Sequence, residues 1–160
     1  MKNLPIPRHL LTTAVVKHLA TQLQPEILVG RGVAPKDGGW VGGQPGSGLY
    51  NSYITLRTGR AITPAPGEPN PIGRVINSWS VSYRMNCFGA MESHAGDVAD
   101  RACEAISTLE GPFTLKGVDW VLQQVVFGGM SDIIPNNSTD PPYWQTSADV
   151  SLHLSRVRAR

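Results

Sequence analysis

The stretch that decides the fold is NSWSVSYRMNCF, residues 77–88. Its side chains alternate without a break between large and polar, and the large ones are Trp79, Val81, Tyr83, Met85 and Cys87. Strict alternation with a period of two predicts a β-strand that places one face on a hydrophobic core and leaves the other face polar.

The same alternation returns near the end of the chain, over residues 144–155. The side chains that share its predicted inward face are Trp144, Thr146, Ala148, Val150, Leu152 and Leu154. Residues 118–127 predict another strand, which is apolar on both faces and is therefore expected to be central or covered twice. A further strand is expected over residues 50–58.

Two helices complete the predicted elements. The first runs over residues 7–24, with a stripe at i, i+3, i+4 spacing made of Leu11, Ala14, Val15, His18, Leu19 and Gln22. The second begins with Ser93 as its N-cap and runs to about Leu109. The fold class is therefore predicted as α+β, a mainly antiparallel sheet of about four to five strands with two helices packed on one face.

The composition predicts a single domain over residues 1–160. Only 16% of the residues are charged, and Gly and Pro are frequent, which suits a strand-rich fold with long loops and also a surface largely covered by other copies or partners. The formal net charge of +2 is too small for a dedicated nucleic-acid binder, and no apolar run is long enough to cross a membrane. Cys87 and Cys103 are expected to be reduced thiols in a protein that folds in the cytosol.

Two long loops rich in Gly and Pro or Asn are expected, over residues 30–48 and 128–143. Loops of this length in a compact domain are commonly functional. Trp40 lies in the middle of the first loop, where it either docks on a neighbouring subunit or folds back on its own core.

The sequence does not complete any of the catalytic, cofactor-binding or metal-binding motifs with which we compared it. Gly30-Arg31-Gly32 begins like a dinucleotide fingerprint, but Pro35 stands where the third glycine belongs. The four histidines are scattered, and none has a partner at metal-ligand spacing. We therefore expect no enzyme activity, no cofactor and no metal. A small enzyme or ligand-binding protein that uses residues 30–48 is the alternative from another functional class.

Charged residues suggest a contact between subunits. Asp97, Asp100 and Glu104 gather on the polar face of the second helix, where a solvated surface is the simpler reading. Arg156, Arg158 and Arg160 continue the inward face of the last strand by parity, so the strand must run past its core or a bulge must change its register. The arginines are either a frayed tail or an arm that reaches the acidic face of the next subunit.

The layout of the whole chain resembles one protein family. A helix is followed by a Gly/Pro-rich loop, the strand LYNSYITLRTGR, the strand NSWSVSYRMNCF and the helix HAGDVADRACEAISTL. A strand, a long loop and a strand end the chain, in VDWVLQQVVFGGMSDIIPNNSTDPPYWQTSADVSLHLSRVRAR. Together these segments look like the tail terminator proteins of long-tailed phages, particularly those that infect actinobacteria.

The resemblance implies a virion protein that assembles in the host cytoplasm. It would form a homo-oligomeric ring, a hexamer, that caps the tail tube at the neck, ends tail elongation and presents a surface for head attachment. Its partners would be the tail tube protein and the head–tail connector protein, with viral DNA passing through the lumen without specific recognition. A head-completion or connector protein, or a tail tube protein of the same virion, is the alternative. The candidate interface residues are Trp40, Asp97, Asp100, Glu104, Arg156, Arg158 and Arg160.

Overall fold

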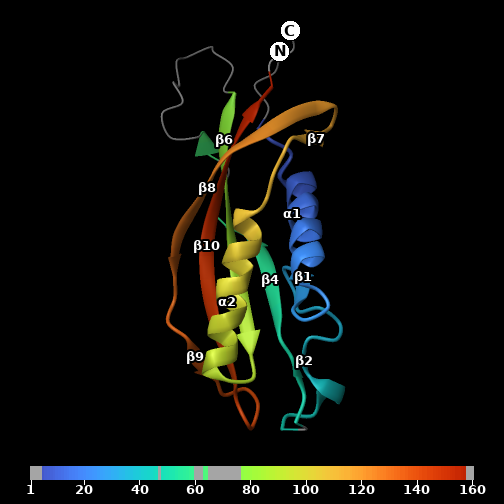
Figure 1. Ribbon diagram of the computed structural model, residues 1–160, viewed down its shortest axis with the longest axis vertical. Helices are drawn as coiled ribbons and strands as arrows, with labels where there is room; N and C mark the ends of the chain where they lie inside the picture. Colours follow the sequence, from blue (N-terminus) through green and yellow to red (C-terminus); the bar gives the residue numbers. More distant parts are fainter. Residues whose placement is uncertain (1–4, 47, 60–62, 65–76, 158–160) are drawn as a thin grey trace.

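The computed structural model describes residues 5–46, 48–59, 63–64 and 77–157. Two long helices and one main sheet dominate the elongated molecule (Figure 1). The helices are α1 (Arg8–Leu23) and α2 (Glu92–Ser107), and a short 3-10 turn, η1, spans Val41–Gly43. The strands are β1 (Leu28–Arg31), β2 (Gly39–Trp40), β3 (Tyr50–Asn51), β4 (Tyr53–Thr58), β5 (Thr63–Pro64), β6 (Ser78–Gly89), β7 (Phe113–Leu115), β8 (Val118–Met130), β9 (Ile134–Asn136) and β10 (Tyr143–Arg156).

The main sheet has the strand order β1-β4-β6-β10-β8-β7. All neighbours on this path are antiparallel except β1 and β4, which run parallel. Short strands β5 and β9 pair with β6 and β10, while β2 and β3 form a separate two-stranded ribbon. The α+β class and the mainly antiparallel sheet are confirmed, but the predicted count of four to five strands is too low. Strands of two to four residues give too little periodic pattern to be recognised.

The two alternating stretches become the central strands β6 and β10, which pair over twelve residue positions from Ser78 to Gly89. Their predicted inward faces meet in the core, because Val81, Met85, Leu152 and Leu154 are each at most 1% exposed. The polar residues of both strands lie together on the opposite face. One face of the sheet is therefore covered and one is open, as the alternation predicted.

Both helices pack on the covered face, with α2 against β6 and β10 and α1 beside α2 and β1 (Figure 1). The stripe predicted for α1 is partly wrong, since its buried residues are Leu11, Thr12, Val15, Leu19 and Leu23. Thr12 is buried because its hydroxyl bonds the hydroxyl of Tyr83 on β6, with 3.0 Å between the oxygens. Burial raises the pKa of Tyr83 to about 12.

Two details of the helices differ from expectation or refine it. Ser93 is not the N-cap of α2, because the helix begins at Glu92 after an extended Met91 and has no side-chain cap. His18 of α1 is half-buried, and its Nε2 lies 2.9 Å from the carbonyl oxygen of Ala105 and 3.1 Å from the hydroxyl of Thr108. His18 is thus a satisfied histidine that joins α1 to the C-terminal end of α2.

The strand β8 differs most from its prediction. It lies between β10 and the three-residue β7, and of its own side chains only Trp120 is buried. Register shifts against β10 leave Gln123 and Gly128 without a partner, as in β-bulges. The first bulge reverses the parity, so Val125 and Phe127 share the helix side with Trp120 and Leu122. The prediction of a central or doubly covered strand is wrong for most of its length.

Both predicted loops contain ordered pieces. Residues 30–48 hold the end of β1, the strand β2 and the turn η1, and residues 128–143 hold the end of β8 and the strand β9. Within the described ranges, no helix is both long and apolar enough to span a bilayer.

Candidate interaction surfaces

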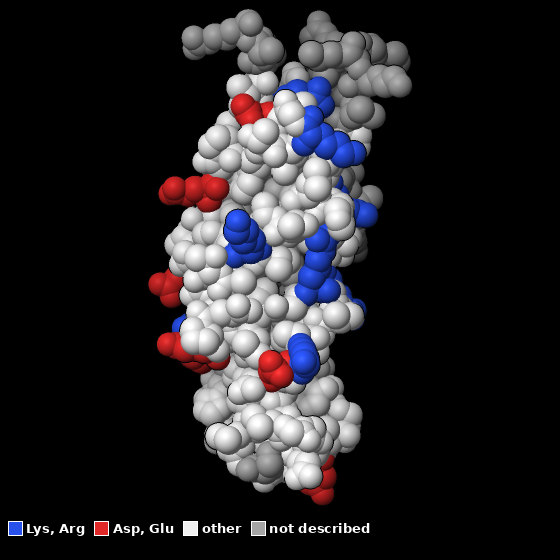
Figure 2. All heavy atoms as spheres, turned by 90° about the vertical axis from the view of Figure 1, so that its right-hand side faces the viewer, with Lys and Arg blue, Asp and Glu red and all other residues white. Residues whose placement is uncertain are grey.

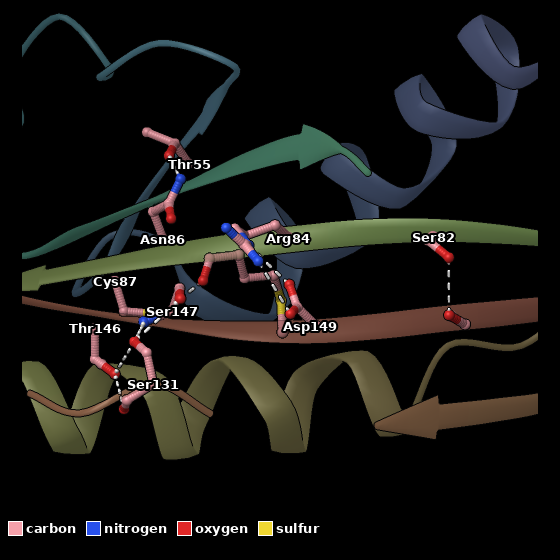
Figure 3. A network of polar contacts seen from close by, with 11 residues as sticks. Thr55, Ser82, Arg84, Asn86, Cys87, Ser131, Thr146, Ser147 and Asp149 are labelled. Carbon is pink, nitrogen blue, oxygen red and sulfur yellow. Dashed lines mark hydrogen bonds and ion pairs between the residues drawn. The ribbon is translucent and has the colours of Figure 1, made fainter. Parts of the chain in front are cut away.

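The open face of the sheet is a network of polar contacts across neighbouring strands (Figure 3). The guanidinium of Arg84 on β6 forms two hydrogen bonds with the carboxylate of Asp149 on β10, at 2.8 and 3.2 Å. Ser82 and Ser151 join the same strands through hydroxyls 3.0 Å apart. Arg84 lowers the pKa of Asp149, so the carboxylate is charged at neutral pH. Because these side chains satisfy one another, the face is polar, ordered and mostly neutral.

Two shallow hollows lie on this open face. One, of about 600 Å³, has Tyr53, Thr55 and Ser147 in its wall, and the other, of about 560 Å³, has Ser82 and Asp149. Arg57 and Asn86 border both. The walls contain hydroxyls, amides, arginines and apolar side chains but no histidine or cysteine, and the carboxylate of Asp149 is already bonded to Arg84. The hollows therefore suit contact with a polar partner surface better than acid–base chemistry.

An aromatic cluster closes one end of the open face. The ring of Tyr53 stacks on Phe88 with centroids 4.5 Å apart, and Tyr50 lies 6.2 Å from Tyr143. Trp40 meets Tyr50 edge to face at 5.1 Å, and its indole nitrogen donates to the hydroxyl of Thr139 at 3.3 Å. Trp40 thus folds back on its own chain and ties the β2–β3 ribbon to the turn before β10. The structure places it in an intramolecular contact rather than on a free docking arm.

The acidic face of α2 is a solvent-exposed stripe. Asp97, Asp100 and Glu104 are all exposed, and the buried residues of α2 lie on its other side. The neighbouring Arg101 turns away toward Glu26, with 2.8 Å between its Nη1 and the carboxylate oxygen. We call Asp97, Asp100 and Glu104 the acidic stripe, which carries three negative charges that no cation of the same helix pairs.

The side of the molecule on which α1 and β1 lie is basic. Figure 2 shows lysine and arginine side chains spread over the side on which α1 and β1 lie, while most acidic side chains stand along one margin. Helix α1 contains Arg8 and Lys17 and no acidic residue. Arg31 at the end of β1 bonds the hydroxyl of Thr13 on α1 at 2.7 Å and remains exposed. We call Arg8, Lys17 and Arg31 the basic side.

The arginines of the last strand are only partly described. Arg156 lies on the helix side of the sheet, with its guanidinium carbon 5.1 Å from the centre of the Trp120 ring. The inward face of β10 thus runs past the end of the core, and Arg156 covers Trp120 by a cation–π contact. The bulges lie on β8, so β10 keeps its parity. Arg158 and Arg160 lie outside the described residues.

Sequence reasoning missed the exposed apolar side chains of β8. Phe127 is 46% exposed and Met130 is 52% exposed, although both lie on the helix side of the sheet. They extend beyond the cover that α2 provides for β6 and β10. One signal for them was present in the sequence, because residues 118–127 are apolar on both faces of the predicted strand. Such a strand needs a covering surface on each face, and that surface can belong to the same chain or to another.

The described part of the chain contains no group of three or more His, Cys, Asp or Glu residues that could hold a metal ion. Cys87 and Cys103 are free thiols. Burial raises the pKa of Cys87 to about 12, and burial also raises that of Cys103, with a further contribution from Asp100. Neither thiol is therefore activated as a nucleophile by its surroundings.

No family model matches this chain, and no curated protein matches it. Among the solved chains that match is one whose name says nothing of function. It is 11% identical, with 96% of this chain and 94% of that chain covered and a TM-score of 0.48. A match of this quality carries no inference about what the protein does.

Proposed function

We propose that this chain is a structural subunit of a phage tail, the terminator that caps the tail tube. Copies of the chain form a hexameric ring at the neck, end tail elongation and present a surface to the head–tail connector protein. The ring contacts the tail tube protein below it, and DNA passes through its lumen without specific recognition. No catalytic residue, metal or cofactor takes part in this role.

The observation that carries the proposal is the division of the molecule into a helix-covered face and an open polar face. This arrangement agrees with the layout of the tail terminators that the whole chain resembles. The open face is held in place by bonds such as Arg84–Asp149 and presents hydroxyls, amides and charged groups together with some apolar side chains. A preformed polar surface of this kind suits contact between rigid protein subunits, where water can bridge the remaining gaps.

The low net charge also supports this role. Protein affinity for DNA depends on the number of phosphates that lysines and arginines neutralise. The chain has 14 such residues against 12 acidic ones, and Arg84 and Arg101 are already paired with carboxylates. A ring of such subunits can surround passing DNA without holding it.

The test is deletion of the coding sequence from a phage that encodes this chain, with complementation by the intact chain as the control. We expect tails of abnormal length together with heads that lack tails, because elongation is no longer terminated and joining fails. Electron microscopy measures both quantities. Tails of normal length that are joined to heads would contradict the proposal.

A second measurement separates the terminator from other parts of the same virion. Particles that carry a labelled copy of the chain are imaged after assembly. We expect one ring of label at the neck, at the tail side of the joint. Label along the whole tail would make the chain a tube protein, and label only on the head vertex would make it a connector.

A further inference from the structure

The lower part of β8 has an open edge. Residues 121–130 lie along β10 on one side and pair with it except at Gln123 and Gly128. On the other side β7 pairs only at positions 118–120, the segment before β7 passes beside Leu122, and no other described strand pairs there. These ten positions contain no charged residue and no proline. Natural edge strands are usually protected by charges, proline or a covering element. An uncharged edge that exposes Phe127 and Met130 is therefore suited to a partner.

The acidic stripe flanks this edge. Ile133, three residues beyond β8, lies so close to Gly96 of α2 that a Cβ there would come within 3.2 Å of its Cδ1. Asp97 and Asp100 border the same shallow hollow as Ile133. The open edge of β8, on the left in Figure 1, thus has exposed apolar side chains, and Asp97 and Asp100 lie beside it on the helix side of the sheet.

The opposite side has complementary properties. β1 is the other end strand of the sheet, and α1 packs beside it on the right in Figure 1. The basic side supplies three positive charges there, and α1 and β1 contain no acidic residue. Leu10, on α1, is 36% exposed, and Val33, just after β1, is 71% exposed. Charge and apolar surface on this side therefore match those beside β8.

The strand directions also match. β1 is parallel to β4, and the steps from β4 to β6, from β6 to β10 and from β10 to β8 are each antiparallel. Three reversals make β8 run opposite to β1. A second copy placed alongside in the same orientation therefore brings its β1 antiparallel to β8, which is the more favourable pairing. The sheet of one copy would continue into the sheet of the next.

We propose that the β8 edge and the acidic stripe of one copy bind the β1 edge and the basic side of a second copy. The contact joins two different surfaces, so its repetition produces a ring when the rotation closes. This contact would join the subunits of the proposed ring. Only the number of copies in the ring rests on the proposed function. The partner is thus a second copy of the same chain, held by strand pairing, apolar contact and opposite charge.

Charge reversal of each surface tests the contact. Variant A carries Asp97→Lys and Asp100→Lys, and variant B carries Arg8→Glu and Lys17→Glu; all four side chains are exposed. Each variant then presents like charges at every contact. We expect the Kd for self-association of either variant, measured by sedimentation velocity at low salt, to rise more than roughly tenfold. Circular dichroism checks that both variants are folded.

Mixing the two variants gives the diagnostic result. In an equimolar mixture, the basic stripe of variant A meets the acidic side of variant B, and the unchanged surfaces attract as in the natural chain. We expect the mixture to recover association close to that of the natural chain, and high salt to weaken it. An isologous contact between two acidic stripes or two basic sides is distinguished by the single variants. In such a contact like charges meet both before and after reversal, so self-association of variants A and B alone would not weaken.

The matched control is Lys116→Glu, which reverses one exposed charge in the turn between β7 and β8, outside both surfaces, and should leave association unchanged. The proposal is overturned if variants A and B associate like the natural chain, if their mixture fails to recover, or if the natural chain stays monomeric at low salt and high concentration. Tail length in the deleted phage tests the proposed function separately. Normal tails together with recovery in the mixture would refute the terminator role and retain the contact.

Discussion

Strands β10 and β8 lie side by side and have nearly equal lengths of 14 and 13 residues, yet their side chains meet very different surroundings. Alternate residues of β10 from Thr146 to Leu154 are buried, while in β8 only Trp120 is. α2 covers β10, and β8 extends beyond it. Apolar residues of β10 stabilise the single chain, whereas in β8 only the upper ones pack on the core and Phe127 and Met130 stay exposed.

The largest expected effect concerns β10, the buried strand of this pair, and the stability of the fold. Leu152→Ala on β10 removes a side chain that is 0% exposed, so we expect the free energy of unfolding to fall by about 2–5 kcal/mol. Phe127→Ala on β8, which is 46% exposed, should change it by less than about 1 kcal/mol. Urea denaturation of both variants measures the difference. Equal losses would show that β8 is part of the folding core.

The second largest effect concerns β8, the exposed strand of the pair, and self-association. Phe127→Lys places a charge on the open edge, which is a common natural protection against strand pairing. We expect self-association to weaken more than roughly tenfold while the urea midpoint stays nearly constant. Sedimentation velocity and denaturation are measured on the same preparation, with Phe127→Leu as the control that keeps the apolar surface. Undiminished association of the lysine variant would remove β8 from the interface.

The smallest effect lies on the open face that β10 shares with β6. Asp149→Asn breaks the bond to Arg84, but the two side chains are 49% and 56% exposed, so the loss of stability should stay below about 1 kcal/mol. Because Arg84 lowers the pKa of Asp149 from 3.8, this contribution is present above that pH and is lost as the pH falls further.

Denaturation of the natural chain and the Asp149→Asn variant at neutral and at strongly acidic pH checks this sign. The natural chain should be slightly more stable than the variant at neutral pH, and the two denaturation midpoints should coincide in acid. A difference that persists in acid would assign the effect to packing rather than to the ion pair.

Much of the fold was predictable from local patterns. The alternation in residues 77–88 and 144–155 predicted two strands with one buried and one open face, and the pairing of β6 with β10 agrees. The acidic residues of α2 were also correctly predicted to be exposed. In each case the period of the backbone determines which side chains share a face, so sequence spacing is sufficient.

Other features depended on contacts between distant segments. The bulge at Gln123 reverses which residues of β8 face the helices, and no residue pattern marks it. Trp40 was equally compatible with a docking arm and an intramolecular contact until Tyr50 and Thr139 were seen beside it. Ser93 has the side chain of an N-cap, but the helix begins two residues earlier, with Met91 at the N-cap position and Glu92 as its first residue.

The sequence by itself determined the class of the fold, the two central strands and the polarity of their faces, because these follow from backbone periodicity. The tertiary structure alone decided where β8 lies, which of its apolar side chains remain uncovered, and that the basic α1 and the acidic α2 lie side by side on one face of the sheet. The physical reason is that covering a surface requires elements distant in sequence. Alternation records which side chains share a face, but not whether anything lies above it.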